Sequence, residues 1–118
     1  MISDTLDSRR AVLAPSVLPP ARVEYVVRMD LECENGNLTL TYVPDRFTVD
    51  EAAVAAYLPL VMAMSLSTEL KAITILEDLV NELVCRWLRV SLSLEGKSVV
   101  VEDRQPGWRN DDLLARLP

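Results

Sequence analysis

Four stretches of the chain alternate between apolar and polar residues, as strands with one wet face do. The clearest runs from Val23 to Cys33, where every odd-numbered residue is apolar and every even-numbered residue but Val26 is charged. The same period predicts three more strands: Leu38–Val43, Arg86–Leu94 and Ser98–Glu102. Short turns separate the first two and the last two stretches, so we expect two hairpins.

The first hairpin has the strongest local turn signal in the chain. Asn35-Gly36 follows the first strand, and both residues tolerate positive φ. A two-residue turn at this point would put Cys33 opposite Leu38. The second hairpin is expected to turn through residues 95–97.

Between the hairpins the apolar period becomes that of helices. Thr48 and Glu51 have the spacing of a capping box, so a helix is expected to begin near Val49. It is apolar on nearly every side as far as Met64. A small domain cannot bury such a helix alone, so we expect a second subunit to cover it.

A second helix is expected over about residues 69–84, with Ser67 as its N-cap. Charged residues such as Asp78 would lie on its wet face. The predicted core stripe consists of Ile73, Leu76, Val80 and Leu83.

The two ends of the chain are expected to lie outside the domain proper. Residues 1–21 hold three prolines and show no clear period, which predicts an extended or mobile arm. Residues 104–118 are charged and predict a C-terminal tail with a short helix near 111–117. A single domain would then span residues 22–103, in the order strand, strand, helix, helix, strand, strand. That order predicts an α+β fold, with an antiparallel sheet and two helices packed on one face.

Composition excludes several kinds of chemistry. The 118 residues include 12 Lys and Arg against 18 Asp and Glu, a net charge of −6, which argues against direct binding of nucleic acid. The chain has no His, the commonest general base and metal ligand, and two Cys cannot complete a zinc site. Three glycines leave no room for a Gly-rich phosphate loop. We therefore expect no metal and no cofactor.

The sequence also bears on location. Residues 1–10 are charged and lack the apolar centre of a signal peptide. We therefore expect a cytoplasmic protein with Cys33 and Cys85 reduced. The apolar run Ala52–Met64 is shorter than the roughly 20 residues of a membrane span, so no membrane association is expected.

Several short motifs between Leu38 and Leu94 together resemble one known family. They are Tyr42-Val43-Pro44-Asp45, Val49-Asp50-Glu51, Tyr57-Leu58, Glu69, Ile75-Leu76-Glu77-Asp78-Leu79 and Arg86-Trp87-Leu88-Arg89-Val90. This segment resembles the 7-cyano-7-deazaguanine reductase family of queuosine biosynthesis and its amidinotransferase-like relatives. The resemblance implies the tunnelling fold, in which several ββααββ subunits close into an oligomeric barrel.

The chain departs from the family's pattern at its reactive positions. The family's nucleophilic Cys, which attacks a nitrile carbon to form a thioimide, lies in the connection between the first two strands. Here that connection is shorter, and Cys33 beside it is the only equivalent. The family's spaced lysines are missing from residues 50–55, and Thr68-Glu69 stands where the family has His-Glu. NADPH-dependent nitrile reduction is therefore not expected.

The resemblance also suggests a ligand. It makes Glu69 a candidate to hold a purine- or 7-deazaguanine-like ring at a subunit boundary through paired hydrogen bonds, with Thr68 and Tyr57 as secondary candidates. A glutamate in the first turn of a helix also simply complements the helix dipole. Cys33 fits either a nucleophile or a small buried apolar residue, and its two acidic neighbours would raise the pKa of its thiol.

Three functions therefore stay open at this point. The chain is a ring-binding relative of the reductases, an assembly subunit that kept the fold and lost the site, or an α+β dimerisation domain of another lineage. Hairpins on separate sheets would exclude the tunnelling fold.

Overall fold

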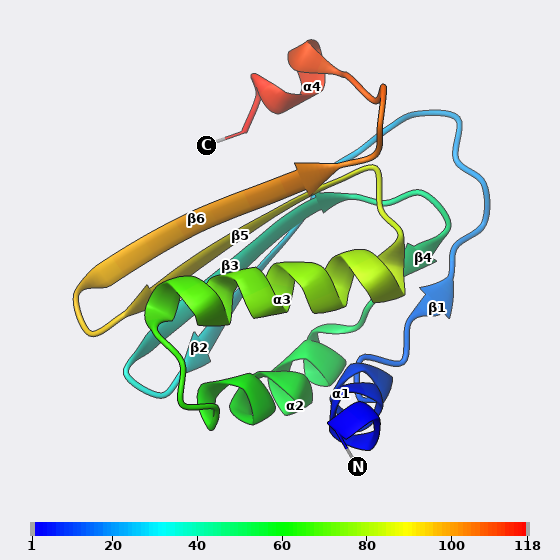
Figure 1. The fold of residues 1–118 in the computed structure, drawn as a ribbon. Helices are drawn as coiled ribbons and strands as arrows, with labels where there is room; N and C mark the ends of the chain where they lie inside the picture. Colours follow the sequence, from blue (N-terminus) through cyan, green and yellow to red (C-terminus); the bar gives the residue numbers. More distant parts are fainter. Residues whose placement is uncertain (1, 118) are drawn as a thin grey trace.

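A four-stranded antiparallel sheet forms the centre of the molecule (Figure 1). The computed structural model describes the backbone of residues 2–117 and the side chains of residues 6–117. The strands lie in the order β2-β3-β5-β6, so β3 and β5 join the two hairpins into one sheet. Their bounds are β2 (Val27–Cys33), β3 (Gly36–Val43), β5 (Trp87–Leu94) and β6 (Lys97–Arg104).

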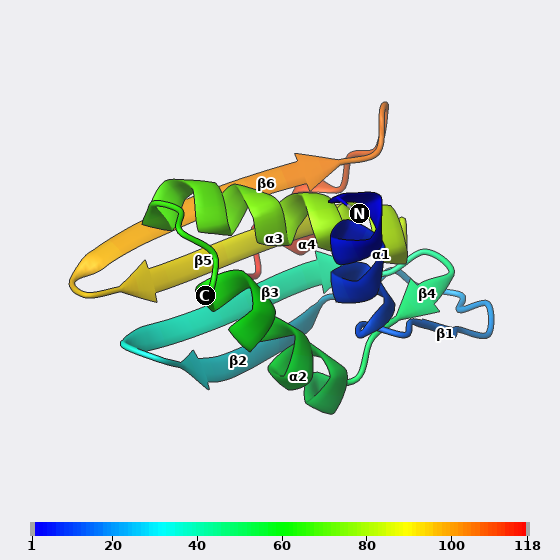
Figure 2. The ribbon, with the colours of Figure 1, turned by 60° about the horizontal axis from the view of Figure 1, so that its bottom comes forward.

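Two helices, α2 (Glu51–Met62) and α3 (Thr68–Leu83), cover one face of this sheet (Figure 2). Alternate residues of the two central strands turn towards them and are fully buried. These are Leu38, Leu40 and Tyr42 from β3 and Leu88, Val90 and Leu92 from β5. The predicted α+β class with an antiparallel sheet is confirmed. The prediction succeeds because the period-two pattern locates the strands and their buried faces.

The register of the first hairpin differs from the prediction. The turn is Glu34-Asn35, so Cys33 pairs with Gly36 instead of Leu38. Asn35 takes the positive φ of 67°, while Gly36 already belongs to β3. A Cβ on Gly36 would lie 1.8 Å from the carbonyl oxygen of Ser93, so this glycine serves close strand pairing. The shift is by two residues, which leaves each side chain on its predicted face.

The predicted capping box is wrong. The N-cap of α2 is Asp50, without a side-chain hydrogen bond, and Thr48 lies in the short strand β4 (Phe47–Thr48). β4 pairs with β1 (Ser16–Val17), which draws Thr48 away from the helix. Its hydroxyl is instead 2.8 Å from the hydroxyl of Tyr42.

The start of α3 agrees with the prediction, and its buried stripe agrees in part: Leu83 is buried, and Leu76 and Val80 pack against the core. The Ser67 hydroxyl accepts a hydrogen bond from the Leu70 N–H at 3.2 Å, so the predicted N-cap is confirmed. The helix is rotated relative to the predicted stripe, so Ile73 is exposed. Its buried residues are Ala72, Ile75, Asp78, Leu79 and Leu83.

The N-terminal segment is not the extended arm that its prolines predicted. Residues Ile2–Ala11 form helix α1, and Leu13 is fully buried in the core. All three prolines follow Ala14, so none of them interrupts this helix. The buried carboxylate of Asp78 holds α1 in place through two arginine side chains, described below.

The C-terminal segment is also tied down. After β6 the chain reaches the short helix α4 (Asp111–Leu114), where a helix was predicted. The indole N–H of Trp108 and the side-chain amide of Asn110 donate to Glu24 at 2.9 and 2.8 Å. Leu117, the last residue that the structure describes, lies over the sheet face opposite α2 and α3.

Candidate functional site

One end of the molecule gathers both hairpin turns and the connection between α2 and α3 (Figures 1 and 2). The Glu95 N–H donates to the Asn35 carbonyl at 3.0 Å and ties the two turns together. Cys33 lies where β2 ends, and Thr68 and Glu69 begin α3. Three of the four residues predicted from the sequence therefore lie at this end.

Two adjoining hollows open here. The first, of about 240 Å³, lies between the turns and the start of α3 and is lined by Thr68 and Lys71 among others. The second, of about 260 Å³, lies between the end of β2 and α2 and is lined by Cys33. Glu34 and Met62 line both hollows, so Thr68 and Cys33 border neighbouring parts of one surface.

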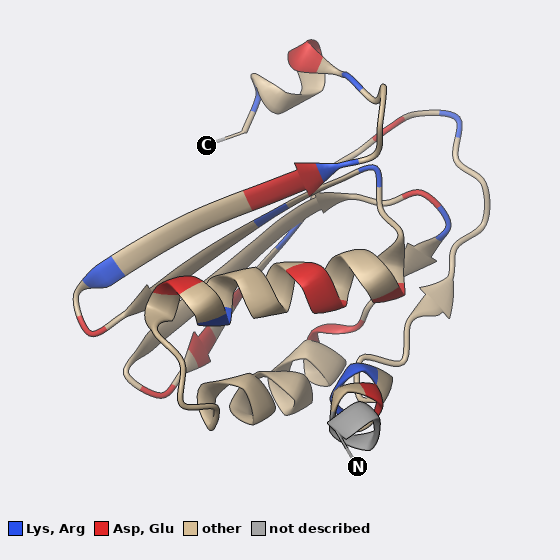
Figure 3. Ribbon diagram, viewed as in Figure 1, with Lys and Arg blue, Asp and Glu red and all other residues tan. Residues whose placement is uncertain are grey.

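Glu69 is one of several exposed carboxylates at this end, with Glu34 and Glu95 in the hairpin turns. Its side chain is 49% exposed, and its Oε2 lies 2.8 Å from the Lys97 Nζ at the start of β6. Figure 3 shows acidic positions at the turns and at the first turn of α3, and a basic position at the start of β6. The hydrogen bond from Lys97 lowers the pKa of Glu69, so the carboxylate is ionised at neutral pH.

Cys33 is in a poor setting for a nucleophile. Its side chain is half-buried and packs against the core. Burial raises the pKa of its thiol, and the charge of Lys71 only partly opposes that rise. The thiolate is the reactive form, so this thiol is weakly nucleophilic at neutral pH. Cys33 and the buried Cys85 are both free.

Tyr57 lies away from this end, in the interior. It is fully buried, and its hydroxyl donates a hydrogen bond to the Asp78 carboxylate. Burial raises the pKa of Tyr57, and the bond to Asp78 raises it further. The structure thus separates Tyr57 from Glu69 and gives its hydroxyl to a buried ionic cluster, contrary to the expected ligand-binding role.

Asp78 is the centre of that cluster, and the sequence analysis placed it on the wet face of its helix. Its side chain is 1% exposed, and its carboxylate lies 2.7 Å from the Arg9 Nε and 2.8 Å from the Arg10 Nε. Burial alone would raise the pKa of Asp78, but the hydrogen bonds from Arg9, Tyr57 and Arg10 outweigh it and hold the pKa below its usual range. The available signal was spacing, because Asp78 follows Ile75 by three residues and so shares its face of α3.

Two further observations limit the chemistry of the part of the chain that is described. Among the described side chains of residues 6–117, no three His, Cys, Asp or Glu come close enough together to hold a metal ion. None of the helices within residues 2–117 has the length and apolar character needed to cross a membrane.

Comparison with known proteins agrees with the resemblance seen in the sequence. No family profile matches the chain. The NADPH-dependent 7-cyano-7-deazaguanine reductases of two strains of Acidithiobacillus ferrooxidans are each 28% identical to it. The match covers 85% of this chain and 82% of the reductase. The similarity thus extends well beyond the segment Leu38–Leu94.

Proposed function

From this distant relationship to the 7-cyano-7-deazaguanine reductases, we propose that the chain is a divergent tunnelling-fold protein that binds a purine- or 7-deazaguanine-like ring at a boundary between subunits. The sheet order β2-β3-β5-β6, with α2 and α3 on one face, is consistent with such a subunit. The observation that carries the proposal is the exposed, ionised carboxylate of Glu69 at the first turn of α3. The proposal includes a homo-oligomer and a cytoplasmic location.

The chemistry of recognition rests on paired hydrogen bonds. A carboxylate can accept two N–H groups from one edge of such a ring, and charge-assisted bonds of this kind are strong and directional. Lys97 contacts Oε2 in an ion pair whose two side chains are about half exposed. Exposed pairs contribute little stability, so a ring with two convergent N–H groups can displace Lys97. Thr68, which precedes Glu69 in the chain, supplies a hydroxyl to the hollow between the turns and the start of α3.

Nitrile reduction with NADPH is excluded from the proposal. The first turns of α2 carry Asp50 and Glu51 and no lysine up to Ala55, which disfavours a phosphate-bearing cofactor there. Cys33 is the candidate for any covalent step. Its sulfur would bond to the nitrile carbon and the nitrile nitrogen would take up one proton, giving a thioimide without oxidation or reduction. The raised pKa of Cys33 makes this addition slow at neutral pH.

Native mass spectrometry with 7-cyano-7-deazaguanine tests the ring site. We expect an oligomer that carries the ring, and a Glu69→Gln oligomer of the same size that has lost it. Glu77→Gln is the matched control, because Glu77 is an exposed carboxylate on the same helix. A wild-type oligomer without ring, or a Glu69→Gln variant that keeps it, contradicts the proposal.

Denaturing the same samples separates binding from covalent chemistry. An adduct that survives denaturation in the wild-type chain and is absent from Cys33→Ser assigns the bond to Cys33. An adduct that survives in Cys33→Ser overturns that assignment and leaves the ring site standing.

One observation favours the second candidate, an assembly subunit without a site. Helix α2 presents an apolar surface to solvent, centred on Leu60, which is 44% exposed. The other exposed residues of this surface are Ala52, Ala55, Ala56 and Pro59. Burial of α2 in an oligomer explains this surface without any ligand. This candidate predicts no ring on either the wild-type or the Glu69→Gln oligomer, and a smaller species for Leu60→Glu.

A further inference from the structure

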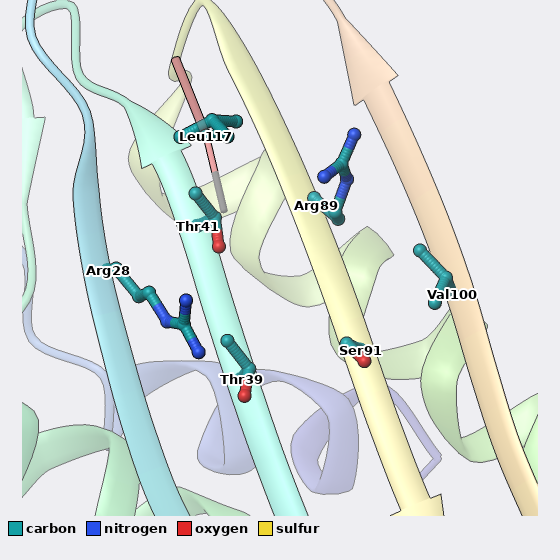
Figure 4. Close-up of a pocket in the computed structure, with 7 residues that line it drawn as sticks. All are labelled: Arg28, Thr39, Thr41, Arg89, Ser91, Val100 and Leu117. Carbon is teal, nitrogen blue, oxygen red and sulfur yellow. The ribbon is translucent and has the colours of Figure 1, made fainter. Parts of the chain in front are cut away.

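The sheet face turned away from α2 and α3 carries a hollow of about 250 Å³ (Figure 4). Two arginines and three hydroxyl-bearing residues line it, together with two apolar side chains at its edge. The polar lining consists of Arg28, Arg89, Thr39, Thr41 and Ser91. No carboxylate lines it, although the chain has a net charge of −6. The charged groups of this lining are therefore the two arginines, and each of them has a long contact to a carboxylate beside the hollow, Asp30 or Glu102.

Strand pairing fixes the arrangement of these groups. Arg28 of β2 pairs with Thr41 of β3, and Thr41 pairs with Arg89 of β5. Neighbouring strands lie about 4.8 Å apart, so the two arginine backbones flank the Thr41 hydroxyl at roughly 10 Å from each other. Figure 4 shows Arg28 extending from β2 towards β3, with Arg89 on the other side of Thr41. The Arg28 guanidinium turns towards Asp30 and the Arg89 guanidinium towards Trp87, so a ligand above Thr41 meets both groups only after at least one of them swings towards it.

Arg89 has a donor that nothing in the described chain accepts. Its Nε is buried and lacks a hydrogen-bond partner. Its guanidinium stacks over the Trp87 ring at 5.0 Å, which fixes its plane, and the contact from Nη2 to Glu102 is long at 3.4 Å. A buried donor without an acceptor is costly, and a ligand can supply the missing acceptor only when the Arg89 side chain turns its Nε towards the hollow.

Arg28 is similarly available. Its contacts to Asp30 are 3.3 and 3.4 Å long, and both side chains are about half exposed or more. Asp30 also accepts a shorter bond of 2.6 Å from the Thr39 hydroxyl, and this bond draws the carboxylate towards β3. Such an exposed pair yields readily to a doubly charged anion.

We propose that this hollow binds a phosphate group, either free or as a monoester. The planar guanidinium fork matches phosphate oxygens in pairs, and the hydroxyls of Thr41 and Ser91 add neutral donors. This hollow is on the opposite face of the sheet from the hollow lined by Cys33. The phosphate proposal can therefore be tested independently of the proposed ring site.

Amide chemical shifts test the site. The ¹⁵N-labelled chain is titrated with sodium phosphate, and with sodium chloride at equal ionic strength. We expect saturable shifts in phosphate alone, centred on residues 39–41 and 89–91. Arg28→Ala and Arg89→Ala should each weaken binding roughly tenfold or more, since each removes a charge-assisted pair of hydrogen bonds. Arg109→Ala is the matched control, because Arg109 is 78% exposed and contacts only Asp111.

Conservative variants and a nucleotide sharpen the result. Arg89→Lys keeps the charge and loses the fork, so it should bind more weakly than wild type. Adenosine 5′-monophosphate and adenosine are titrated in the same way. If the monophosphate shifts the same amides with higher affinity than phosphate and adenosine causes no shift, the site takes a monoester. Equal affinities for the monophosphate and phosphate identify free phosphate. If Arg89→Ala unfolds through loss of the Trp87 stack, Arg28→Ala on the edge strand carries the test. No saturable shift, or unchanged affinity in Arg28→Ala, overturns the proposal.

Discussion

Helix α3 carries two carboxylates that pair with cations in opposite surroundings. Glu69, in its first turn, is half exposed and meets one lysine. Asp78, near its middle, is almost fully buried and meets two arginines and a tyrosine hydroxyl. Both pairs have short N–O distances, 2.8 Å for Glu69 and 2.7 Å for the nearer arginine of Asp78. Burial, more than distance, therefore distinguishes them.

The difference in burial decides whether a carboxylate stabilises the fold or can bind a ligand. A buried carboxylate cannot exchange its partners for water, so it holds elements together. An exposed carboxylate keeps water as an alternative partner, so it can exchange a lysine for a ligand at little cost. Asp78 links α1, α2 and α3, whereas Glu69 is free to serve the proposed ring site.

Removing the buried carboxylate should have the largest effect. Asp78→Asn leaves the side chains of Arg9 and Arg10 without a counter-charge. Losing one partner of a buried pair costs about 3–5 kcal/mol, and we expect at least about 2 kcal/mol here because both arginines keep a path to water. Urea unfolding measures the loss. Glu77→Gln, one residue away and exposed, should change stability by less than about 0.5 kcal/mol. Equal effects of the two variants would contradict the comparison.

Lowering the pH should weaken the same ion pairs gradually, with a smaller effect on the free energy of unfolding. The pKa of Asp78 is lowered in the folded chain, so its stabilisation is complete above the ordinary aspartate pKa of about 3.9 and is lost as the pH falls through the lower folded value. The stability gap between wild type and Asp78→Asn should therefore be constant from pH 7 to about 5 and shrink below about 4. Urea unfolding across this range measures it, and a gap that persists at the lowest pH argues against an ionised Asp78.

Breaking the exposed pair should have the smallest effect. Lys97→Met removes the partner of Glu69, and we expect little or no change in the free energy of unfolding, because water replaces the lysine. Added salt at about 1 M shortens the Debye length to about 3 Å and should reduce even that difference. Thermal unfolding at low and high salt measures both. A loss as large as that of Asp78→Asn would mean that Glu69 is structural.

The sequence located most elements because their signals are local. Alternation marked β3 and β5, and Ser67 marked the start of α3 through a bond to a residue three positions away. The errors came from partners that lie far along the chain. Gly36 was assigned to a turn because the close approach of Ser93 has no local signature. Thr48 was assigned to a cap because its pairing with Ser16 joins distant segments.

The candidate site divides in the same way. Cys33, Thr68 and Glu69 were predicted from the resemblance to the reductases, and the structure brings them to one end of the molecule. Tyr57 was chosen from a motif shared with the reductases, and its hydroxyl contacts Asp78, 21 residues away. The periodicity of α2 marked the position of Tyr57 as apolar and gave no sign of a charged partner.

The ion pairs of Arg9 and Arg10 with Asp78 determine when α1 can dock during synthesis. Arg9 and Asp78 are 69 residues apart, so the ribosome finishes α1 roughly 3–14 seconds before it makes the residue that α1 docks on. During that interval the helix has no carboxylate to hold and must stay in water. Its sequence suits this, because polar and charged residues make up most of it. Helix α1 therefore docks only after the middle of α3 has been made.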